Sequence, residues 1–423
     1  MLLISIDTLR PDHLGAYGYA IPTSPIIDRL SASGVRVATC VASAPETAPA
    51  MASLLTGMYQ YRTRVVANRG TLQAYVSTIA ERLQESGYAT AGFIGNTLLG
   101  ADRGFDQGFE HFEAFRHENP LAPSDDRGVT LASDWIAAAP ATPWFVWLHL
   151  IDPHGPYISA KPSWSAGFTY PDDTFGADAP VPPGTGNFGL GIVPTYQQFL
   201  GKDARPSDFV RRYDGEIRFA DAQLERLLGA IDPSETVVVL TADHGESLTE
   251  HDEYFQHGWF LYDTTLTVPL IVSWPGVLPS DTVLDRQVSA VDVAPTIYEI
   301  VGVAPAAADA TPVDGESFAR ELFHADASPP AMAFAVGPRE NHPFTVRAGR
   351  WKLIHTPAGR PPVPTKNYPI HGFDTPERFE LYDTIADPGE TTNLADRHPE
   401  RVTELKGALA AFRTKLRMSG RNW

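Results

Sequence analysis

The chain has 423 residues, of which 43% are hydrophobic and 20% are charged, a composition typical of a globular protein that buries its core without disulfides. Its formal net charge of −18 argues against nucleic acid and anionic membranes as partners, because both need a basic protein surface. Such a chain repels an anionic substrate at long range, so a phosphate or sulfate site needs a metal, an arginine or a histidine nearby.

The start of the chain and its one cysteine bear on the cellular compartment. The apolar run from Leu2 to Ile6 is too short for the core of a signal peptide, and no segment reaches the about 20 apolar residues of a membrane span. The single cysteine, Cys40, excludes an intrachain disulfide, and its apolar neighbours predict an inert buried thiol. We therefore expect a cytoplasmic protein without a membrane segment, and leave open a trimmed N-terminus and a homo-oligomer.

Short apolar runs alternate with segments of helical periodicity as far as the apolar run that ends at Asp243. Strands are predicted at residues 2–6, 35–42, 88–95, 144–150 and 236–243, and helices at 24–34, 48–57, 76–87 and 208–231. This alternation predicts an α/β fold with a mostly parallel central sheet flanked by helices on both faces. Ligands of such sheets bind beyond the carboxyl ends of the strands, where several polar residues of this sequence fall.

Two later regions depart from this alternation. Residues 155–207 are rich in Pro, Gly and aromatic side chains and show little periodicity, which is typical either of a cap over a site or of disorder. After about residue 325, the pattern predicts two strands around a turn at Gly349 and a closing amphipathic helix. We therefore predict a catalytic domain at 1–325 that includes the 155–207 cap, and a smaller C-terminal sheet-plus-helix subdomain at 326–423.

Four residues at the ends of predicted elements have side chains suited to a divalent metal. They are Asp7 after the first strand, Thr47 at the start of a helix, and Asp243 and His244 before Gly245. Aspartate supplies a hard oxygen ligand and histidine a borderline nitrogen ligand. At a helix N-terminus, backbone N–H groups and the helix dipole favour negative charge on the Thr47 oxygen, and a bound cation would favour it further. The alternatives are a hydrogen-bonded Asp-His loop and a threonine that only caps its helix.

Three histidines are candidates for contact with the reacting group. They are His149 and His154, on either side of a turn, and His257, thirteen residues after His244. An imidazole near such a site binds non-bridging oxygens or protonates a leaving group near neutral pH. A lone histidine is more often a packed, hydrogen-bonded residue, so the weight of this prediction comes from the three occurring together with the acidic residues.

The surroundings of the substrate are indicated less directly. Arg10 is a candidate for a bidentate clamp on an anion, or else it pairs with Asp12 or Asp28. Tyr157 is a candidate substrate contact in the 155–207 segment, where aromatic side chains either offer apolar surface or pack the segment down. Other candidates of this segment are the aromatic residues Trp164, Tyr170 and Phe175 and the cationic residues Lys161 and Lys202.

Several stretches of the sequence resemble the sulfatase branch of the alkaline phosphatase superfamily. They are LLISIDTLRPDHLGAYGY at the start, TAPAMASLLTG from Thr47, YDGEIRFADAQLERLL and VPLIVSWPG in the middle, and GRWKLI and ELYDTIADPGETTNLA near the end. The resemblance spans nearly the whole chain. It implies an alkaline phosphatase-like fold followed by the C-terminal subdomain of sulfatases.

The sequence departs from this family at the position of the nucleophile. Sulfatases convert a cysteine or serine of a C/S-x-P-x-R motif to formylglycine, whereas the matching run here is TAPAM, from Thr47 to Met51. Threonine cannot become formylglycine, and Met51 replaces the motif arginine. In addition, Thr8 stands where typical sulfatases have a second metal-binding aspartate. We therefore expect no formylglycine in this protein.

What remains is similar to members of the superfamily with a threonine nucleophile: phosphoethanolamine transferases, lipoteichoic acid synthases and some phosphonate or phosphodiester hydrolases. The stretches that carry this likeness are DHGESLTEHDEYFQHG at 243–258 and HLIDPHGPY at 149–157. The likeness implies a metal site of Asp7, Thr47, Asp243 and His244, with His149, His154 and His257 as phosphate contacts or acid and base, or with His257 on a second metal. Because this chain lacks the membrane helices of the transferases, water or a soluble acceptor is favoured over a lipid.

We therefore predict a metal-dependent hydrolase of phosphate or phosphonate esters, either monoesters or diesters, that acts on a small anionic substrate. Thr47 would attack phosphorus in line with the leaving group, His154 or His257 would assist departure, and water would cleave the phosphothreonine. One Mn²⁺ or Zn²⁺ is expected ahead of Ca²⁺ or Mg²⁺. The alternatives are a sulfuric ester hydrolase that works without formylglycine and a non-catalytic, anion-binding member of the fold.

Overall fold

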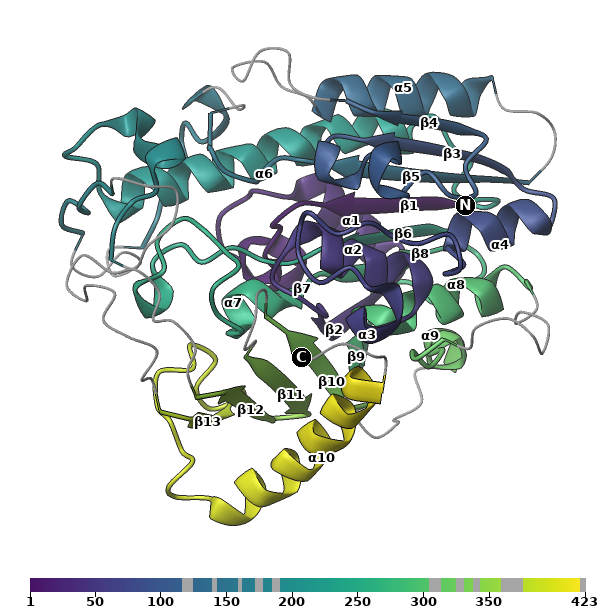
Figure 1. The fold of residues 1–423 in the computed structure, drawn as a ribbon. Helices are drawn as coiled ribbons and strands as arrows, with labels where there is room; N and C mark the ends of the chain where they lie inside the picture. The colour runs from purple at the N-terminus through teal and green to yellow at the C-terminus, as the bar shows by residue number, and fades with distance from the viewer. Residues whose placement is uncertain are drawn as a thin grey trace.

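Two sheets with their helices make up the fold of the computed structural model (Figure 1). The structure describes residues 1–115, 125–138, 143–158, 162–171, 178–184, 191–303, 313–324, 331–337, 343–358 and 376–418. The larger sheet belongs to the N-terminal part of the chain, and the smaller sheet and the last helix form the C-terminal part.

Within the described residues, the larger sheet has nine strands in the order β4-β3-β5-β1-β6-β8-β2-β7, with β9 also paired to β2. They are β1 Leu2–Ile6, β2 Val35–Val41, β3 Ala89–Ile94, β4 His111–Ala114, β5 Trp144–Leu150, β6 Val238–Ala242, β7 Thr267–Val268, β8 Leu270–Ser273 and β9 Thr282–Ser289. The run from β4 to β6 is parallel throughout, whereas β8 is antiparallel to β6 and to β2. The predicted mostly parallel sheet is therefore confirmed.

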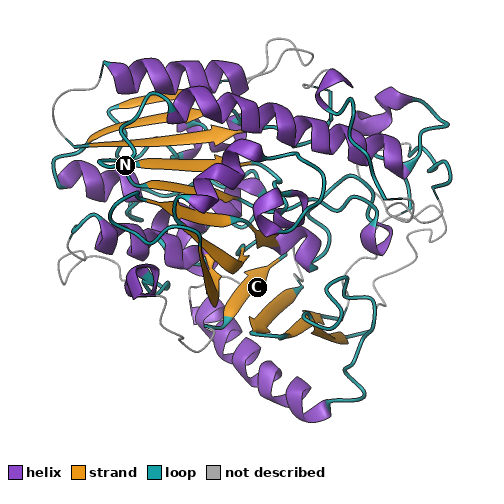
Figure 2. Ribbon diagram, turned by 180° about the vertical axis from the view of Figure 1, so that it is seen from behind, coloured by secondary structure: helices purple, strands orange, loops and turns teal. Residues whose placement is uncertain are grey.

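Helices cover both faces of this sheet (Figure 2). The helices of the N-terminal part are α1 Pro25–Ala32, α2 Thr47–Thr56, α3 Gln60–Thr63, α4 Ile79–Glu85, α5 Asp125–Ala137, α6 Pro206–Leu228, α7 Asp263–Leu266, α8 Val293–Ile300 and α9 Ala319–His324. α6 contacts α1 and α5, whereas α2 contacts α4 and α8. Every residue of β1 and β6 is buried, which explains why their sequences are continuous apolar runs rather than alternating ones.

The sequence signals that delimit helices are present in the structure. Thr78 and Glu81 form a capping box at the start of α4, with each side chain accepting a hydrogen bond from the backbone N–H of the other, at 3.1 and 2.8 Å. Gly57 ends α2 with a φ of 69°, a left-handed conformation that favours glycine. As a result, α2 ends at Thr56, and the separate helix α3 begins at Gln60.

The C-terminal part is an antiparallel sheet with one long helix. Its strands are β10 Ala333–Val336, β11 Phe344–Ala348, β12 Trp351–Thr356 and β13 Arg378–Asp383, in that order, and its helix is α10 Pro399–Met418. The predicted pair of strands around Gly349 is confirmed as β11 and β12. The Phe412 ring of α10 stacks on Phe334 of β10 and meets Tyr59 edge-on, so the sheet and helix pack onto the start of α3. The boundary at residue 325 stays a prediction.

The described parts of the 155–207 segment pack against α6 and its surroundings. The Trp164 ring meets Phe219 of α6 edge-on, and the Tyr170 hydroxyl donates a 2.6 Å hydrogen bond to the buried Asp214 of the same helix. Tyr170 and Trp164 thus hold the segment down, while Lys202 is exposed and Lys161 and Phe175 lie outside the described residues. A role for this segment as a cap stays a prediction.

Two further expectations concern the thiol and the membrane. Cys40 is fully buried in β2, and burial raises the pKa of its thiol, as expected for an inert core residue. Among the helices that the structure describes, none combines the length and the apolar character needed to cross a bilayer. The predicted cytoplasmic location and the homo-oligomer stay predictions.

Candidate active site

The candidate site lies at the carboxyl ends of the three central strands of the larger sheet. β1 pairs in parallel with β5 on one side and β6 on the other, with Ile6 level with Leu150 and Ala242. Asp7 directly follows β1, and Asp243 directly follows β6. Parallel neighbours that end at the same level bring both carboxylates together, at the edge where ligands of α/β sheets bind.

Asp7, Asp243 and His244 each direct one potential ligand atom to the same point, and these atoms lie within 4.8 Å of one another. The Nε2 atom of His244 is 3.4 Å from Asp243 Oδ2 and 4.0 Å from Asp7 Oδ1. The hydroxyl of Thr47 is 3.4 Å from the same nitrogen. All four side chains are at most 1% exposed, so the predicted ligand set comes together in a buried place.

In each aspartate, the outer oxygen accepts hydrogen bonds from the protein. The inner oxygen, which faces His244 Nε2, accepts none within the described structure. Asp243 Oδ1 accepts hydrogen bonds from the backbone N–H groups of Thr8, at 3.1 Å, and His244, at 2.7 Å. Asp7 Oδ2 accepts a 2.7 Å hydrogen bond from the Asn96 amide. Asp7 Oδ1 and Asp243 Oδ2 have no hydrogen-bond partner within the described structure. Two bare, buried carboxylate oxygens beside an imidazole nitrogen fit a divalent cation, because an unpaired buried charge is costly.

The electrostatics of the two aspartates fit the same conclusion. Burial and the negative charge of Asp7 raise the pKa of Asp243 above its ordinary value. Burial acts in the same direction on Asp7, but the charge of His154 and the contact with His149 outweigh it and hold the pKa of Asp7 low. Two carboxylates this close repel one another when both are ionised, and a divalent cation between them removes the repulsion.

Backbone conformation around these ligands is unusual at two places. Thr8 has a φ of 56°, a left-handed conformation that is strained for a β-branched residue, and this turn directs its N–H to Asp243. The backbone of Gly245, which follows His244, lies close to the segment that contains Thr264. A Cβ atom at this position would lie 2.1 Å from the carbonyl oxygen of Thr264. Glycine therefore fits the close approach directly after the Asp-His pair, where a larger residue would clash.

Thr47 is the first residue of α2, and Glu46 rather than Thr47 occupies the N-cap position. The next backbone N–H, that of Ala48, donates a 2.9 Å hydrogen bond to the side chain of Asn68. The helix therefore starts beside the candidate metal-ligand cluster of Asp7, Asp243 and His244, where the helix dipole favours negative charge on the Thr47 oxygen. One turn later, Met51 is fully buried in the hydrophobic core, so the position of the motif arginine holds a packing residue.

His149 lies in β5 behind Asp7 and is fully buried. The indole N–H of Trp147 donates to Ser5 Oγ at 2.9 Å, and this hydroxyl is 2.8 Å from His149 Nδ1. The Ser5 hydroxyl thus bridges the indole and the imidazole, which fixes the orientation of the ring and turns Nε2 toward Asp7. That nitrogen is 3.5 Å from Asp7 Oδ2. This placement favours support of Asp7 over contact with the substrate.

His154 and His257 lie beside the cluster, and both are half-buried. The His257 ring centre is 4.3 Å from that of His244 and 5.1 Å from that of His154. His257 Nδ1 is 2.9 Å from Glu246 Oε1, and His154 Nδ1 is 2.6 Å from the carbonyl oxygen of Gly155. Both predicted histidines therefore reach the site, each with one ring nitrogen already engaged.

The two predicted substrate contacts are engaged elsewhere in the structure. Arg10 donates to both oxygens of Asp12, at 3.0 and 2.7 Å, and to Glu250 at 2.8 Å. Its alternative pairing with Asp12 is thus what the structure shows, while Asp28 binds the N–H of Ala16. Tyr157 is fully buried, and its hydroxyl donates to Glu246 at 3.2 Å.

Three residues of this site were not identified from the sequence. Asn68 binds the N-terminus of α2, Asn96 holds the outer oxygen of Asp7, and Glu246 joins His257 to Tyr157. Asn96 follows β3 directly after Gly95, so its place beyond a strand end was the available signal. Glu246 directly follows the Asp-His-Gly run and was the polar neighbour to consider.

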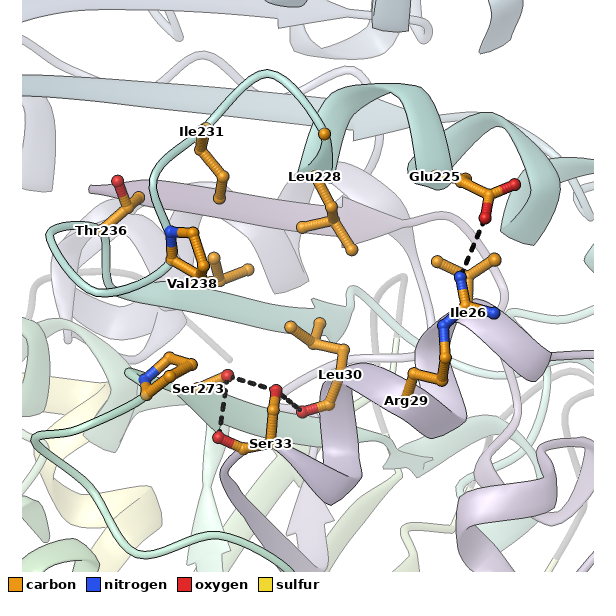
Figure 3. A pocket seen from close by; sticks show the side chains of 13 residues that line it. Ile26, Arg29, Leu30, Ser33, Glu225, Leu228, Ile231, Thr236, Val238 and Ser273 are labelled. Carbon is orange, nitrogen blue, oxygen red and sulfur yellow. Dashed lines mark hydrogen bonds and ion pairs between the residues drawn. The ribbon is translucent and has the colours of Figure 1, made fainter.

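Two cavities lie on different edges of the larger sheet. One of about 470 Å³ is lined by Asp12, His13 and Glu250, beyond the carboxyl ends of β1 and β6. The other, of about 300 Å³, lies between α1 and α6 (Figure 3). Figure 3 shows Leu30 and Leu228 pointing into it from the two helices, near Val238 at the start of β6. It therefore opens at the edge opposite to the metal-ligand cluster.

Comparison with known proteins identifies the family of this chain. The family model described as Sulfatase matches residues 1–303, and the model described as N-sulphoglucosamine sulphohydrolase, C-terminal, matches residues 250–415. The delta 4,5-hexuronate-2-O-sulfatase of Bacteroides thetaiotaomicron is 24% identical, over 93% of this chain and 84% of its own length.

Two solved structures align with the whole molecule. A protein in complex with its substrate D-glucosamine-2-N,6-O-disulfate aligns with a TM-score of 0.80 and 18% identity, over 100% of this chain and 99% of its own. The phosphonate monoester hydrolase of Agrobacterium radiobacter aligns with a TM-score of 0.73 and 21% identity, over 98% and 95% of the two chains. Both alignments confirm the predicted α/β fold with its C-terminal subdomain.

Proposed function

Because the chain belongs to the sulfatase family, we propose that it hydrolyses the sulfate ester of a small molecule, such as a sulfated sugar, at a divalent metal beside Thr47. A relative is named as a hexuronate sulfatase, and one structural neighbour holds a disulfated sugar as its substrate. These comparisons favour the sulfate-ester alternative over the phosphorus-ester hydrolase that the sequence led us to predict first. The sulfate-ester hydrolase and the phosphorus-ester hydrolase are both hydrolases of this family.

The approach of Thr47 to the cluster of Asp7, Asp243 and His244 is the observation that carries a hydrolytic role. The bare inner oxygens of both aspartates and Nε2 of His244 would hold the cation. When bound, a divalent cation lowers the pKa of a neighbouring hydroxyl and offsets negative charge on the ester. The mixed oxygen and nitrogen set suits Mn²⁺ or Zn²⁺ better than Ca²⁺ or Mg²⁺.

The residues of this chain divide the reaction between them. Thr47 Oγ1, whose proton passes to solvent, forms a bond to sulfur while the bond from sulfur to the ester oxygen breaks, and protonated His154 or His257 gives that oxygen its proton. Water then attacks sulfur and breaks its bond to Thr47 Oγ1. One proton of the water returns to Thr47, the other returns to the histidine, and sulfate is released. Asn96 and the N–H of Thr8 keep the two aspartates in place throughout.

A second candidate is hydrolysis of phosphonate or phosphate esters by the same residues. The observation that favours it is Thr47 itself. An unmodified alcohol forms a phosphate ester that water cleaves directly. This reaction therefore does not need the second hydroxyl that a formylglycine hydrate provides. The structural likeness to a phosphonate monoester hydrolase shows that the fold accommodates such chemistry in another protein.

Turnover of matched nitrophenyl esters separates the two candidates. We would assay sulfate, phosphate monoester, phosphodiester and phenylphosphonate substrates with protein loaded with Mn²⁺ or Zn²⁺, and determine kcat/KM for each. The proposal predicts the highest kcat/KM for a sulfate ester, and a loss of at least about a hundredfold in Thr47→Ala. Thr414→Ala, on the exposed side of α10, is the matched control and retains the full rate.

Other outcomes have defined meanings. A higher kcat/KM for a phosphonate or phosphate ester would replace the first candidate by the second. Full activity of Thr47→Ala would refute the threonine nucleophile in both. Mass spectrometry of the peptide that contains Thr47 should give the mass of unmodified threonine. Protein that neither binds metal nor turns over any ester would support a non-catalytic member of the fold.

A further inference from the structure

Tyr157, Glu246 and His257 form a continuous hydrogen-bonded chain that ends at the candidate site. Glu246 uses its two carboxylate oxygens separately, with Oε1 2.9 Å from His257 Nδ1 and Oε2 accepting from the Tyr157 hydroxyl at 3.2 Å. A carboxylate is an acceptor only, so the proton of the first contact belongs to Nδ1 of His257. The reactions assigned above do not use Glu246 or Tyr157.

The far end of this chain is held rigidly. Glu246 is 1% exposed and Tyr157 is fully buried. The Tyr157 ring meets Tyr213 and Phe255 edge-on, at ring-centre distances of 5.6 and 6.5 Å. In addition, the carbonyl oxygen of Glu246 accepts a 3.0 Å hydrogen bond from Arg10. Neither the backbone nor the carboxylate of Glu246 is therefore free to turn away from the histidine.

The near end of the chain reaches the reacting groups. The His257 ring lies 4.3 Å from the ring of His244, centre to centre, which places it beside the metal-ligand cluster. Gly258 follows with a φ of 94°, a left-handed conformation that turns the chain sharply after the histidine. His154 differs, because within the described residues its Nδ1 contacts the carbonyl oxygen of the adjacent Gly155. Gly155 is adjacent to His154 in the sequence and moves with it, whereas Glu246 is held by hydrogen bonds from Tyr157 and Arg10.

We propose that Glu246 is a positioning residue that keeps a proton on Nδ1 of His257, so that Nε2 is the nitrogen that exchanges protons with the ester. Tyr157 fixes the carboxylate that does this. The inference rests on the proposed function and chooses between its two candidate histidines: His257, rather than His154, delivers the proton to the leaving oxygen. A carboxylate that orients an imidazole in this way selects one tautomer and one ring orientation.

Nitrogen-15 spectra of the histidine rings test the tautomer without any substrate. In the wild type, the proton of neutral His257 should reside on Nδ1. Glu246→Gln keeps an amide oxygen that accepts from Nδ1, so this variant should retain the tautomer and shows that the fold tolerates a change here. Glu246→Ala should give a mixture of the two tautomers. An unchanged His257 spectrum in Glu246→Ala would overturn the proposal, whether or not the protein turns over any ester.

Kinetics then test the consequence for the reaction. Glu246→Ala should lower kcat by at least about tenfold with little change in KM, and more for esters with poor leaving groups than for nitrophenyl esters. Glu246→Gln should recover part of this loss, and Tyr157→Phe should lose less than Glu246→Ala. Glu225→Gln, which breaks only an exposed ion pair with Arg29, is the control. A kcat of Glu246→Ala equal to that of an active wild type would refute the positioning role alone, whereas an inactive wild type refutes the proposed function.

Discussion

Two buried clusters of carboxylates in this molecule balance their charge in different ways. Where α7 meets the smaller sheet, Lys352 Nζ lies 2.7 Å from Asp263 Oδ1 and 2.9 Å from Glu390 Oε1. Arg347 pairs with Asp263 as well. The side chains of this junction cluster are at most 14% exposed, and its two carboxylates face two cations from the same chain.

The cluster at the carboxyl edge of the larger sheet has two carboxylates, and within the part of the chain that the structure describes neither of them contacts a lysine or an arginine. Asp7 and Asp243 face His244, and each leaves one oxygen without a hydrogen-bond partner in the described structure. The junction cluster is therefore complete once the chain has folded, whereas the candidate metal-ligand cluster would be completed by a cation from solution, as we propose. Removing a charge should have opposite effects on the stability of the two clusters.

The largest effect is expected for Asp243→Asn. This variant loses a proposed metal ligand. Activity should therefore fall by more than about 100-fold, the upper end of the loss typical when a residue that only hydrogen-bonds to a ligand is removed. The metal-free variant should unfold at the same temperature as the metal-free wild type or a higher one, because the repulsion with Asp7 is gone. Thermal unfolding with and without Mn²⁺, Zn²⁺ and a chelator measures both quantities.

The wild type supplies the reference for this experiment. Its unfolding temperature should rise on addition of metal and fall on chelation, whereas that of Asp243→Asn should respond much less. A metal-free variant that is several degrees less stable than the metal-free wild type would show that Asp243 supports the fold without a cation, and the contrast between the clusters would fail.

Lys352→Met should produce the largest loss of stability. Lys352 is 1% exposed, so the substitution leaves Glu390 without its recorded cation in a buried place. Breaking a buried ion pair by removing one partner typically costs about 3–5 kcal/mol of unfolding free energy. Urea unfolding measures this loss, and Lys202→Met, at an exposed position, should change it by less than about 0.5 kcal/mol. Equal effects of the two substitutions would contradict the assigned role of Lys352.

A smaller effect is expected at Glu253, a buried carboxyl that accepts hydrogen bonds from Ser247 and from the N–H of Trp259. Burial, together with the charges of Glu246 and Glu250, raises its pKa to about 8 from an ordinary value of 4.5. The folded protein therefore keeps a proton that the unfolded chain releases between these values. The stability that this proton contributes is complete below about pH 4.5 and is lost as the pH rises through 8.

Glu253→Gln replaces that proton by a permanent neutral group. At pH 9 the variant should unfold at a higher temperature than the wild type, by about 2 °C or more, and the difference should shrink toward pH 5. Glu253 thus balances its charge in a third way, by holding a proton in place of a cation. A constant difference at both pH values would show that the carboxyl does not titrate in this range.

The sequence predicts the larger features of the fold because they depend on local patterns. Continuous apolar runs identify β1, β5 and β6, and helical periodicity identifies α6. The order of the strands does not follow from such patterns. The antiparallel position of β8 between β6 and β2, for example, depends on how distant parts of the chain pack.

The same division applies to the candidate site. Asp7, Asp243 and His244 were predictable because each follows a strand, and strand ends converge in a parallel sheet. For Arg10, the local pairing with Asp12 was among the predicted alternatives, whereas the pairing with Glu250 was not, because Glu250 lies 240 residues away in sequence. The burial of His149 behind Asp7 was hidden as well, since a histidine at the end of a strand points to either face.

The cavity between α1 and α6 has a practical consequence for inhibitor discovery. It is lined largely by aliphatic side chains, as Figure 3 shows for Ile26, Leu30 and Leu228, and it opens on the edge of the sheet away from Thr47. A compound that entered this cavity would leave Thr47 and the aspartates uncovered, and a screen by binding alone would not distinguish it from an inhibitor. Ranking hits by competition with a sulfate or vanadate ion, rather than by affinity, separates them from compounds that reach the aspartates.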